Sequence, residues 1–524
     1  MESTIRRAWI ILILALLAGC SLGRPSETQT VIVITATFPP APVSGQPTPT
    51  VFQFAAPTPT RAPSSAFEAP TSEGNAQAVL RDYAIQPGDT LFGIAARFGL
   101  TVEALIAENA LTDPDRLEVG QVLRVRTLPE QPGSDYRIVP DSRLVRAPGA
   151  LAFDVAAFVG SQPGYIRQAV DSVDEVVYTA GQLVERVAVE YSIDARLLLA
   201  LLEYQGRWLS AASLSQEAID RPLRAPASPN GFDRIGLYRQ LTWAADNLNR
   251  GYYGWGQGLF RWVQTSDSQR LLLPDGLNAA TVGVQHLFSL TSDAATWRAH
   301  VGADGFYALY VGLFGDPFRD ARDPVVPSGV IQPLLTLPFA RGETWLFTGG
   351  PHGGWGSGSA WAAVDFAPPD DPKARNTLCY VSEFFVTAPI DGVIARSGDG
   401  AVVIDLDGDG DETTGWTLLV LHLATQDRIA VGTPVRVGDR LGRPSCEGGF
   451  STGTHVHIAR RYNGEWIPAA CDGCTDAYQR PPLVMGGWEF AGLPRQEYQG
   501  YMVRQGDRRV AEQMRGVADN EVSW

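Results

Sequence analysis

The stretch Thr454-His455-Val456-His457 decides how the C-terminal part of this chain folds. Side chains alternate across a β-strand, so the two histidines leave the same face and can converge on one point. His352 and Asp365 can reach that point from neighbouring segments. Two imidazole nitrogens and one carboxylate oxygen leave a fourth tetrahedral position open on zinc, which distinguishes a catalytic from a structural zinc site. The pattern therefore predicts a catalytic metal site on a β-strand.

The spacing of the surrounding motifs sharpens this prediction. His352 follows Gly350-Pro351 and lies thirteen residues before Asp365, and His422 lies between Asp365 and the histidine pair. Together these motifs resemble the M23 zinc metallopeptidases. The lysostaphin-like branch of that family has its ligand histidine four residues before the aspartate, where this chain has Trp361. The resemblance is therefore to the β-lytic endopeptidase branch.

The resemblance implies different roles for the five residues. It implies that His352, Asp365 and His457 bind zinc, whereas His422 and His455 stay off the metal and assist catalysis. Zinc lowers the pKa of bound water to about 7, one imidazole can take the proton, and the other can stabilise the developing oxyanion. Four of the six histidines of the chain lie at these positions, so ordinary core histidines explain the pattern poorly.

The region around this site has the pattern of a β domain. After about residue 337 the helical period stops, and short β-type runs alternate with glycine-rich turns. Such runs predict an antiparallel β domain at 337–490, followed by a tail at 491–524 that packs on it. The expected strands are 385–388, 392–396, 401–406, 416–423, 434–437 and 455–460.

The N-terminus has the pattern of an export signal. Arg6 and Arg7 precede an apolar run that is too short to span a bilayer as a helix. Leu17-Ala18-Gly19-Cys20 resembles the bacterial lipobox, which implies that residues 1–20 form a lipoprotein signal and that Cys20 carries a lipid anchor. A plain signal peptide is the alternative. Residues 21–76, rich in Pro, Thr and Ser, predict an extended linker between the membrane and the folded part.

The cysteine count fits an exported chain. Without Cys20, four of the five cysteines remain, and an even number in this compartment predicts disulfides. Of the three possible pairings we favour Cys379 with Cys446 and Cys471 with Cys474. A structural zinc site at the last pair is the alternative.

Residues 80–127 predict a small strand, helix, helix, strand module, with helices at 92–98 and 102–109. Its turn, Pro87-Gly88-Asp89-Thr90-Leu91, and the position of Asn109 resemble a LysM module. That family binds the N-acetylglucosamine backbone of peptidoglycan or chitin, and a plain spacer is the alternative. The resemblance implies a shallow binding groove between loops, and the expected glycan-binding residues are Gly88, Asp89, Thr90, Ile94 and Asn109.

The middle of the chain, residues 150–330, predicts a mostly α domain. The segment from Tyr191 to Gly206 resembles the opening of a lysozyme-like lytic transglycosylase, whose catalytic glutamate would lie where this chain has Gln205. Glutamine cannot donate the proton that glycosidic cleavage requires, so we expect a non-catalytic glycan-groove or spacer domain. Transglycosylase activity through Glu203 is the alternative. The expected helices are 166–191, 195–204, 237–250, 279–292 and 307–314, with His286 and His300 as core or surface histidines.

The net charge of the chain and one acidic loop bear on possible partners and cofactors. The formal charge of −15, without a cluster of Lys and Arg, argues against nucleic acid as a partner. Asp405, Asp407 and Asp409 occupy the first, third and fifth places of a calcium-loop pattern, but Trp416 stands at its twelfth place instead of glutamate. A hairpin turn explains these residues equally well.

The sequence thus predicts a lipid-anchored, zinc-dependent endopeptidase that cleaves peptide bonds of peptidoglycan. The LysM module would keep the enzyme close to its polymer and so raise the effective substrate concentration. Two alternatives stay open. One is a non-catalytic regulator of other wall hydrolases, and the other is a bifunctional hydrolase that also cuts glycan.

Overall fold

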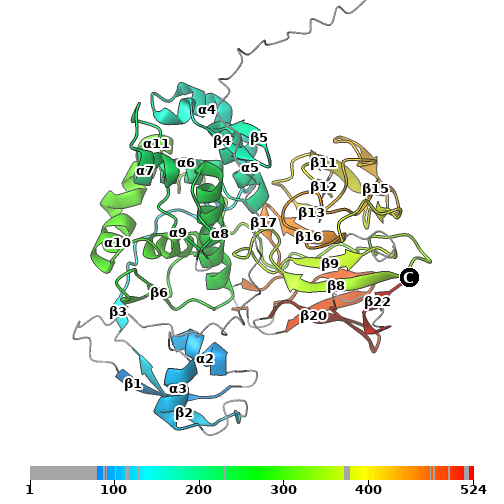
Figure 1. Ribbon diagram of the computed structural model, residues 1–524, viewed down its shortest axis with the longest axis horizontal. Coiled ribbons are helices and arrows are strands. Elements are labelled where there is room, and N and C mark those ends of the chain that lie inside the picture. Colours follow the sequence, from blue (N-terminus) through cyan, green and yellow to red (C-terminus); the bar gives the residue numbers. More distant parts are fainter. Residues whose placement is uncertain are drawn as a thin grey trace, which may run out of the picture. The chain divides into compact units, whose positions relative to one another are not determined.

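The computed structural model describes most of the chain after residue 78 (Figure 1). The described residues are 79–524 except 87, 88, 90, 99, 101, 112–116, 128, 129, 229, 230, 371–377, 472, 473, 476, 477, 494, 495 and 513–517. The expected lipoprotein signal with Cys20 and the linker at 21–76 lie outside this part and stay predictions. Among the described residues, no helix combines the length and apolarity needed to cross a bilayer.

The first folded unit has the expected βααβ order. The elements are β1 (Val79–Ala84), α2 (Leu91–Phe98), α3 (Val102–Asn109) and β2 (Val122–Thr127), with β1 and β2 paired antiparallel. Ile94, Leu105 and Leu123 are fully buried between them. The apolar residues of two short helices and one hairpin therefore form a small core of their own.

The middle region is mostly helical, as expected. Its longer helices include α5 (Ala180–Tyr191), α6 (Ala195–Gly206), α8 (Leu237–Gly256) and α9 (Ala279–Ser289). The other elements are β3 (Glu130–Pro132), α4 (Val155–Ser161), β4 (Val170–Val173), β5 (Val176–Thr179), α7 (Gln216–Asp220), β6 (Trp262–Gln264), β7 (Arg270–Leu272), α10 (Ala294–Val301) and α11 (Ala308–Phe314).

The prediction of one helix over 166–191 is wrong in its first half. Residues 170–179 form the antiparallel hairpin of β4 and β5, which turns at Asp174 and Glu175 with positive φ angles of 50° and 68°. Thr179 then starts α5 with a capping box to Gln182. The β-branched residues of 170–179 thus pair as strands, and the helix begins only at its cap.

The C-terminal region is antiparallel β, as expected. Its main sheet has the order β14-β11-β12-β13-β16-β9-β8-β22, with β17 beside β16. The strands are β8 (Trp345–His352), β9 (Ala363–Ala367), β11 (Gly392–Gly398), β12 (Ala401–Asp405), β13 (Trp416–Leu421), β14 (Pro434–Val435), β16 (Val456–Tyr462), β17 (Glu465–Trp466) and β22 (Glu521–Val522). A short pair, β10 (Val386–Thr387) and β15 (Arg440–Gly442), accompanies it.

The expected boundary between domain and tail at residue 490 falls inside a strand. A second sheet contains β18 (Val484–Met485), β19 (Trp488–Leu493), β20 (Gln496–Arg504) and β21 (Asp507–Val510), in chain order. β22 then returns to pair with β8 at the edge of the main sheet. The tail is therefore part of the β domain, and Trp488, Met502 and Val522 are buried in its core.

Both faces of the main sheet are buried, and alternate residues belong to different cores. In β13, Leu418 and Val420 belong to the core inside the β domain, whereas Leu419 and Leu421 belong to the core that continues into the helices. Polar contacts join the same regions: Tyr252 donates to Glu465 at 2.8 Å, and Ser192 donates to the Gly464 carbonyl at 2.7 Å. The helical region therefore shares a continuous hydrophobic core with one face of the main sheet, and the other face belongs to a separate core.

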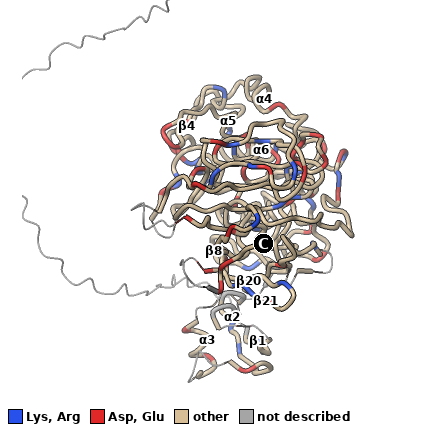
Figure 2. Tube along the Cα trace, turned by 90° about the vertical axis from the view of Figure 1, so that its right-hand side faces the viewer, with Lys and Arg blue, Asp and Glu red and all other residues tan. Residues whose placement is uncertain are grey.

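Acidic and basic positions are interspersed along the described trace in the view of Figure 2. A phosphate backbone is bound by clustered Lys and Arg, whereas the formal charge of this chain is −15. The expectation that nucleic acid is not a partner stays a prediction.

Candidate metal centre

Four neighbouring strands of the main sheet bring the predicted site residues together. His457 on β16 lies opposite Asp365 on β9 and, on its other side, opposite Leu421, the residue before His422. His352 ends β8, the strand that pairs with β9. The antiparallel registers therefore place residues that are far apart in sequence at one place on the sheet.

Three acceptor atoms face one another at the predicted zinc site. His352 Nε2 lies 2.9 Å from His457 Nδ1, and the Asp365 Oδ1 atom lies 3.3 Å and 3.4 Å from these two nitrogens. The other ring nitrogens donate to carbonyls: His352 Nδ1 to Gly350 at 2.8 Å, and His457 Nε2 to Gly354 at 3.1 Å. In its neutral form each ring therefore directs a lone pair at the common point.

This arrangement fits a zinc ion. Ligands about 2.0–2.1 Å from zinc in a tetrahedron lie about 3.3 Å from one another, close to the separations observed here. Asp365 Oδ1 is buried and has no hydrogen-bond partner among the described residues. Facing lone pairs and an unsatisfied buried carboxylate oxygen are unfavourable unless a cation lies between them. His352, Asp365 and His457 are thus suited to hold the metal.

The pKa shifts differ among the three ligands: burial alone would lower the pKa of His352, but Asp365 outweighs it and raises that pKa, so a metal ion would compete with a proton for this ring. Burial alone would raise the pKa of Asp365, but the neighbouring His352 and His455 imidazoles outweigh it and hold that pKa well below its usual range. Burial lowers the pKa of the His457 imidazole, and the adjacent His352 ring adds to this effect. An ionised carboxylate beside a neutral imidazole is the state that binds a metal ion.

His455 and His422 lie beside this group but present different atoms. His455 Nδ1 donates to the Gly453 carbonyl at 2.7 Å, which leaves Nε2, 3.8 Å from Asp365 Oδ2, free to accept a proton. His422 Nδ1 donates to the Glu447 carbonyl at 3.0 Å, and its ring centroid lies 4.5 Å from that of His455. Burial and the two neighbouring histidines lower the pKa of His422 to about 3, so this imidazole is neutral.

Two glycines make room for the centre. A Cβ atom on Gly349 would lie 2.4 Å from Asp365 Oδ2, and one on Gly354 would lie 2.5 Å from the Trp466 ring. The ladder between β8 and β9 is irregular on both sides of Gly349, which lets His352 reach the site. Only glycine therefore fits at positions 349 and 354. The motif spacing in the sequence does not indicate this requirement.

A loop anchored by the helical region supports His457. This loop follows β8 and contains Gly354, whose carbonyl accepts from His457. Further along it, Gly358 N donates to Asp246 Oδ1 at 2.7 Å, and Ser357 Oγ donates to Asp246 Oδ2 at 3.2 Å. Asp246 on α8 therefore fixes the segment that orients a metal ligand, although it lies more than one hundred residues earlier in sequence.

Asp246→Ala is expected to weaken zinc binding about tenfold or more, because loss of outer-shell support commonly costs about 10–100-fold in metal affinity. The measurement is competition for zinc against a chelator of known affinity. Asp246→Asn keeps the Oδ1 acceptor for Gly358 N and is expected to retain most of the affinity. Equal zinc affinity in the alanine variant and the unmodified chain would contradict this role for Asp246.

Tyr498 belongs to the site and was missed by sequence reasoning. Its ring stacks on His352 with centroids 4.2 Å apart and an interplanar angle of 22°. Tyr498 lies on β20, in the region that the sequence predicted only as a packing tail. The sole signal was the aromatic segment Tyr498-Gln499-Gly500-Tyr501, whose periodicity does not indicate its partner.

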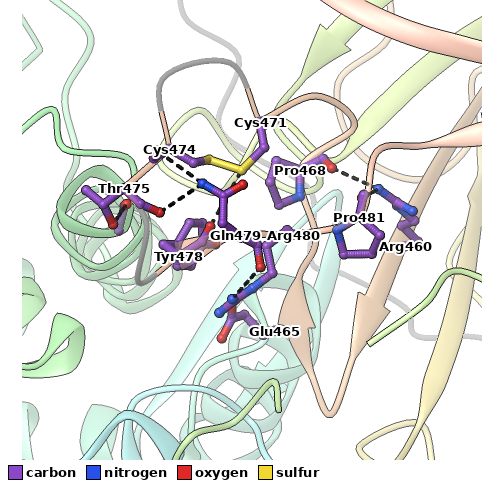
Figure 3. Close-up of a disulfide and its surroundings, with 11 residues drawn as sticks. Arg460, Glu465, Pro468, Cys471, Cys474, Thr475, Tyr478, Gln479, Arg480 and Pro481 are labelled. Atoms are coloured by element: carbon purple, nitrogen blue, oxygen red, sulfur yellow. Dashed lines mark hydrogen bonds and ion pairs between the residues drawn. A yellow bond between two sulfur atoms is a disulfide. The ribbon is translucent and has the colours of Figure 1, made fainter. Parts of the chain in front are cut away.

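Both favoured disulfides are present. Cys379 pairs with Cys446, and Cys471 pairs with Cys474. The first disulfide lies close to Thr454, because Thr454 N donates to the carbonyl of Leu378, the residue before Cys379, at 2.8 Å. Figure 3 shows the second disulfide near the ion pair of Arg480 with Glu465. A structural zinc site at Cys471 and Cys474 is therefore wrong.

The predicted glycan-binding residues of the first unit are mostly structural where they are described. Gly88 and Thr90 lie outside the described residues. Asp89 accepts from Tyr83 Oη at 2.5 Å and from Gln86 N at 2.8 Å within its own turn. Ile94 is fully buried, so its side chain cannot contact glycan. Asn109 hydrogen-bonds the Leu105 carbonyl and both backbone polar groups of Arg124, which ties α3 to β2.

The middle domain offers no obvious general acid at the expected place. Glu203 accepts hydrogen bonds from Leu209 N at 2.8 Å, Ser210 N at 3.1 Å and Ser210 Oγ at 2.6 Å, so it caps a turn. His286 is buried, and this burial, together with a smaller effect of the positive charge of Arg250, lowers its pKa to about 4. His300 hydrogen-bonds Tyr204 and lies against Phe288. Both histidines are thus packing residues, as expected.

The acidic loop after β12 behaves as a turn. Asp405, Asp407 and Asp409 carboxylates do come within 4.8 Å of one another. However, Asp405 accepts from Gly410 N at 2.8 Å and Asp409 accepts from Asp411 N at 2.7 Å. Carboxylates that cap their own loop fit the hairpin explanation, and calcium is not supported.

Comparisons with known proteins agree with this geometry. Residues 83–126 match the LysM domain model, and residues 137–326 match the model of the LasA N-terminal domain. Protease LasA of Pseudomonas aeruginosa is 27% identical over 338 residues, which cover 61% of this chain and 72% of that protein. The chain therefore combines a LysM match with a longer region similar to Protease LasA.

Solved M23 structures resemble parts of the chain. The M23 metalloprotease pseudoalterin, from the deep sea, is 22% identical with a TM-score of 0.26 and covers 34% of this chain and 96% of its own. The catalytic domain of lysostaphin from Staphylococcus simulans is 21% identical with a TM-score of 0.18. The match covers 24% of this chain and 88% of the lysostaphin chain. The domain expected to resemble a transglycosylase matches the model of the LasA N-terminal domain.

Proposed function

We propose that this protein is a zinc-dependent endopeptidase that cleaves peptide bonds in peptidoglycan. The observation that carries the proposal is the triangle of His352 Nε2, Asp365 Oδ1 and His457 Nδ1, with separations of 2.9–3.4 Å. The similarity to Protease LasA supports peptidase chemistry. When bound there, zinc supplies Lewis-acid polarisation of the scissile carbonyl and activation of water.

The two remaining histidines are suited to move protons. His455 is fixed through Nδ1, so its Nε2 atom is the acceptor that faces the centre and can act as general base. It can return the proton to the leaving amine. His422, neutral and fixed through Nδ1 to the Glu447 carbonyl, has a lone pair on Nε2 and can serve as a second proton acceptor. Tyr498 holds the His352 ring in orientation by stacking on it.

The LysM match supports a polymer substrate. We infer that the module binds the glycan of peptidoglycan and raises the effective concentration of peptide bonds near the catalytic site. The signal pattern that ends at Cys20 and the two disulfides support export and a lipid anchor at the membrane surface. The bond cleaved lies in the peptide stem or cross-bridge.

Two other functions are less well supported. A non-catalytic regulator would not need an intact ligand set, yet all three ligands and both flanking histidines converge here. A bifunctional hydrolase would need a free acid in the middle domain, but Glu203 is occupied by three hydrogen bonds from Leu209 and Ser210. The endopeptidase is therefore the function that the site supports best.

Incubation of purified peptidoglycan with the full chain is expected to release new amino termini, detected by mass analysis of the products. Removal of zinc by a chelator should abolish this release, and added zinc should restore it, because the metal would polarise the scissile carbonyl and activate water. Anhydro-muramyl ends would instead support a transglycosylase. Binding without new ends of either kind would support the regulator.

A further inference from the structure

A groove of about 750 Å³ lies between the helical region and the loop that follows β8. Its walls come from the β4–β5 hairpin, the segment before α8, the first half of α8, and Gly356 with Ser357. Sites that bind small ligands commonly have volumes of about 300–1,000 Å³. The groove is thus large enough for a few sugar units, and it is separate from the metal centre.

Aromatic rings and polar groups both line this groove. Its lining includes four aromatic side chains, and Phe232 is 52% exposed, with the Arg239 guanidinium 4.9 Å above its ring. Ile235 is 43% exposed in the same lining. Partly exposed apolar side chains beside carboxylates and guanidinium groups are suited to a ligand with both apolar faces and many hydroxyls.

The loop after β8 runs from the metal centre to the groove. Gly354, whose carbonyl accepts from His457, lies three residues before Ser357 in the groove. Three residues span at most about 11 Å when extended. The same length corresponds to about three residues of a peptide stem. A stem attached to a glycan in the groove could therefore place its peptide bonds at the metal centre.

On the basis of the proposed function, we propose that this groove binds the glycan strand of peptidoglycan and presents its stem peptides to the metal centre. Its charged lining consists of three aspartates and two arginines, so the charge is nearly balanced. Such a lining suits an uncharged polysaccharide better than a polyanion. Aspartates accept from sugar hydroxyls, while aromatic rings cover the C–H faces of the sugars.

The first test compares two substrates with the double variant Phe232→Ala/Arg239→Gln. Intact peptidoglycan carries glycan, whereas cross-linked peptides released from it by an amidase do not. Loss of an exposed ring and its stacked guanidinium is expected to raise KM for peptidoglycan about tenfold, with little change in kcat. Hydrolysis of the free peptides should stay unchanged. Leu259→Ala, 68% exposed outside this lining, is the matched control and should change neither.

The results separate the groove from the proposed activity. An equal rise in KM for both substrates would mean that the groove binds peptide. An unchanged KM for both substrates would mean that the groove binds no part of the substrate that hydrolysis requires. Either result overturns the proposal. If the unmodified chain cleaves neither substrate, the proposed function fails. Hydrogen exchange of the full chain with soluble, peptide-free glycan then still tests the groove. Protection of 231–243 supports glycan binding, and protection confined to 83–126 overturns it.

Discussion

His457→Ala is expected to abolish zinc retention and peptidoglycan hydrolysis together, whereas His455→Ala should lose hydrolysis but keep the metal. His457 Nδ1 is one corner of the ligand triangle, so its loss leaves two ligands and an open cavity. His455 instead lies 3.8 Å from the outer oxygen of Asp365 and directs a free Nε2 atom at the centre. Removal of a general base typically lowers the rate about 10²–10⁴-fold.

Zinc content per chain, measured by elemental analysis after dialysis, separates the two roles. The expected values are near zero for His457→Ala and near one for His455→Ala and the unmodified chain. His300→Ala is the control, because that histidine packs against Phe288 in the helical region. If the His457 variant kept zinc, or if the His455 variant stayed fully active, the division of roles would be wrong.

The site was largely predictable because motif spacing and strand periodicity constrain it. Alternation placed His455 and His457 together, and the interval from His352 to Asp365 resembled the β-lytic type of motif, which stays a prediction. The structure adds what spacing cannot supply. Gly350 and Gly354 act through backbone carbonyls, and any residue type has a carbonyl. Tyr498 and Asp246 reach the site through tertiary packing.

The fold was predictable in order but not in detail. The expected helix at 166–191 shows why: its apolar residues fit a helical period, but Asp174 and Glu175 adopt left-handed conformations that close a hairpin. In the LysM module, position alone suggested that Ile94 and Asn109 bind glycan. Burial of Ile94 and the backbone hydrogen bonds of Asn109 show that both hold the module together.

Glu412 has the largest expected effect on stability. Its carboxylate contacts three guanidinium groups: Arg461 at 2.8 Å, Arg146 at 3.1 Å and Arg396 at 3.2 Å. The side chains of Glu412 and Arg461 are only 8% and 1% exposed. Because Arg146 precedes the helices and the other two lie in the main sheet, this cluster joins the helical and β regions.

The cluster also predicts a loss of stability in acid. Burial alone would raise the pKa of Glu412, but Arg396, Arg461 and Arg146 outweigh it and lower that pKa to about 2. Since the folded-state pKa lies below the ordinary value, this contribution is complete above about pH 4.5 and is lost as the pH falls towards 2. The difference corresponds to about 3 kcal/mol of unfolding free energy.

Glu412→Gln is expected to lower the unfolding free energy of the unit formed by the helical and β regions by about 3–5 kcal/mol at pH 7, because it leaves buried guanidinium groups without their counter-charge. Urea unfolding, followed by tryptophan fluorescence, measures this loss, and the variant should also lose the acid sensitivity between pH 4.5 and 2. Glu185→Gln is the matched control. Glu185 contacts the same Arg146 at 3.7 Å, but its side chain is 46% exposed, so its removal should cost about 0–1 kcal/mol. Equal effects of the two substitutions would mean that burial of the cluster does not hold the helical and β regions together.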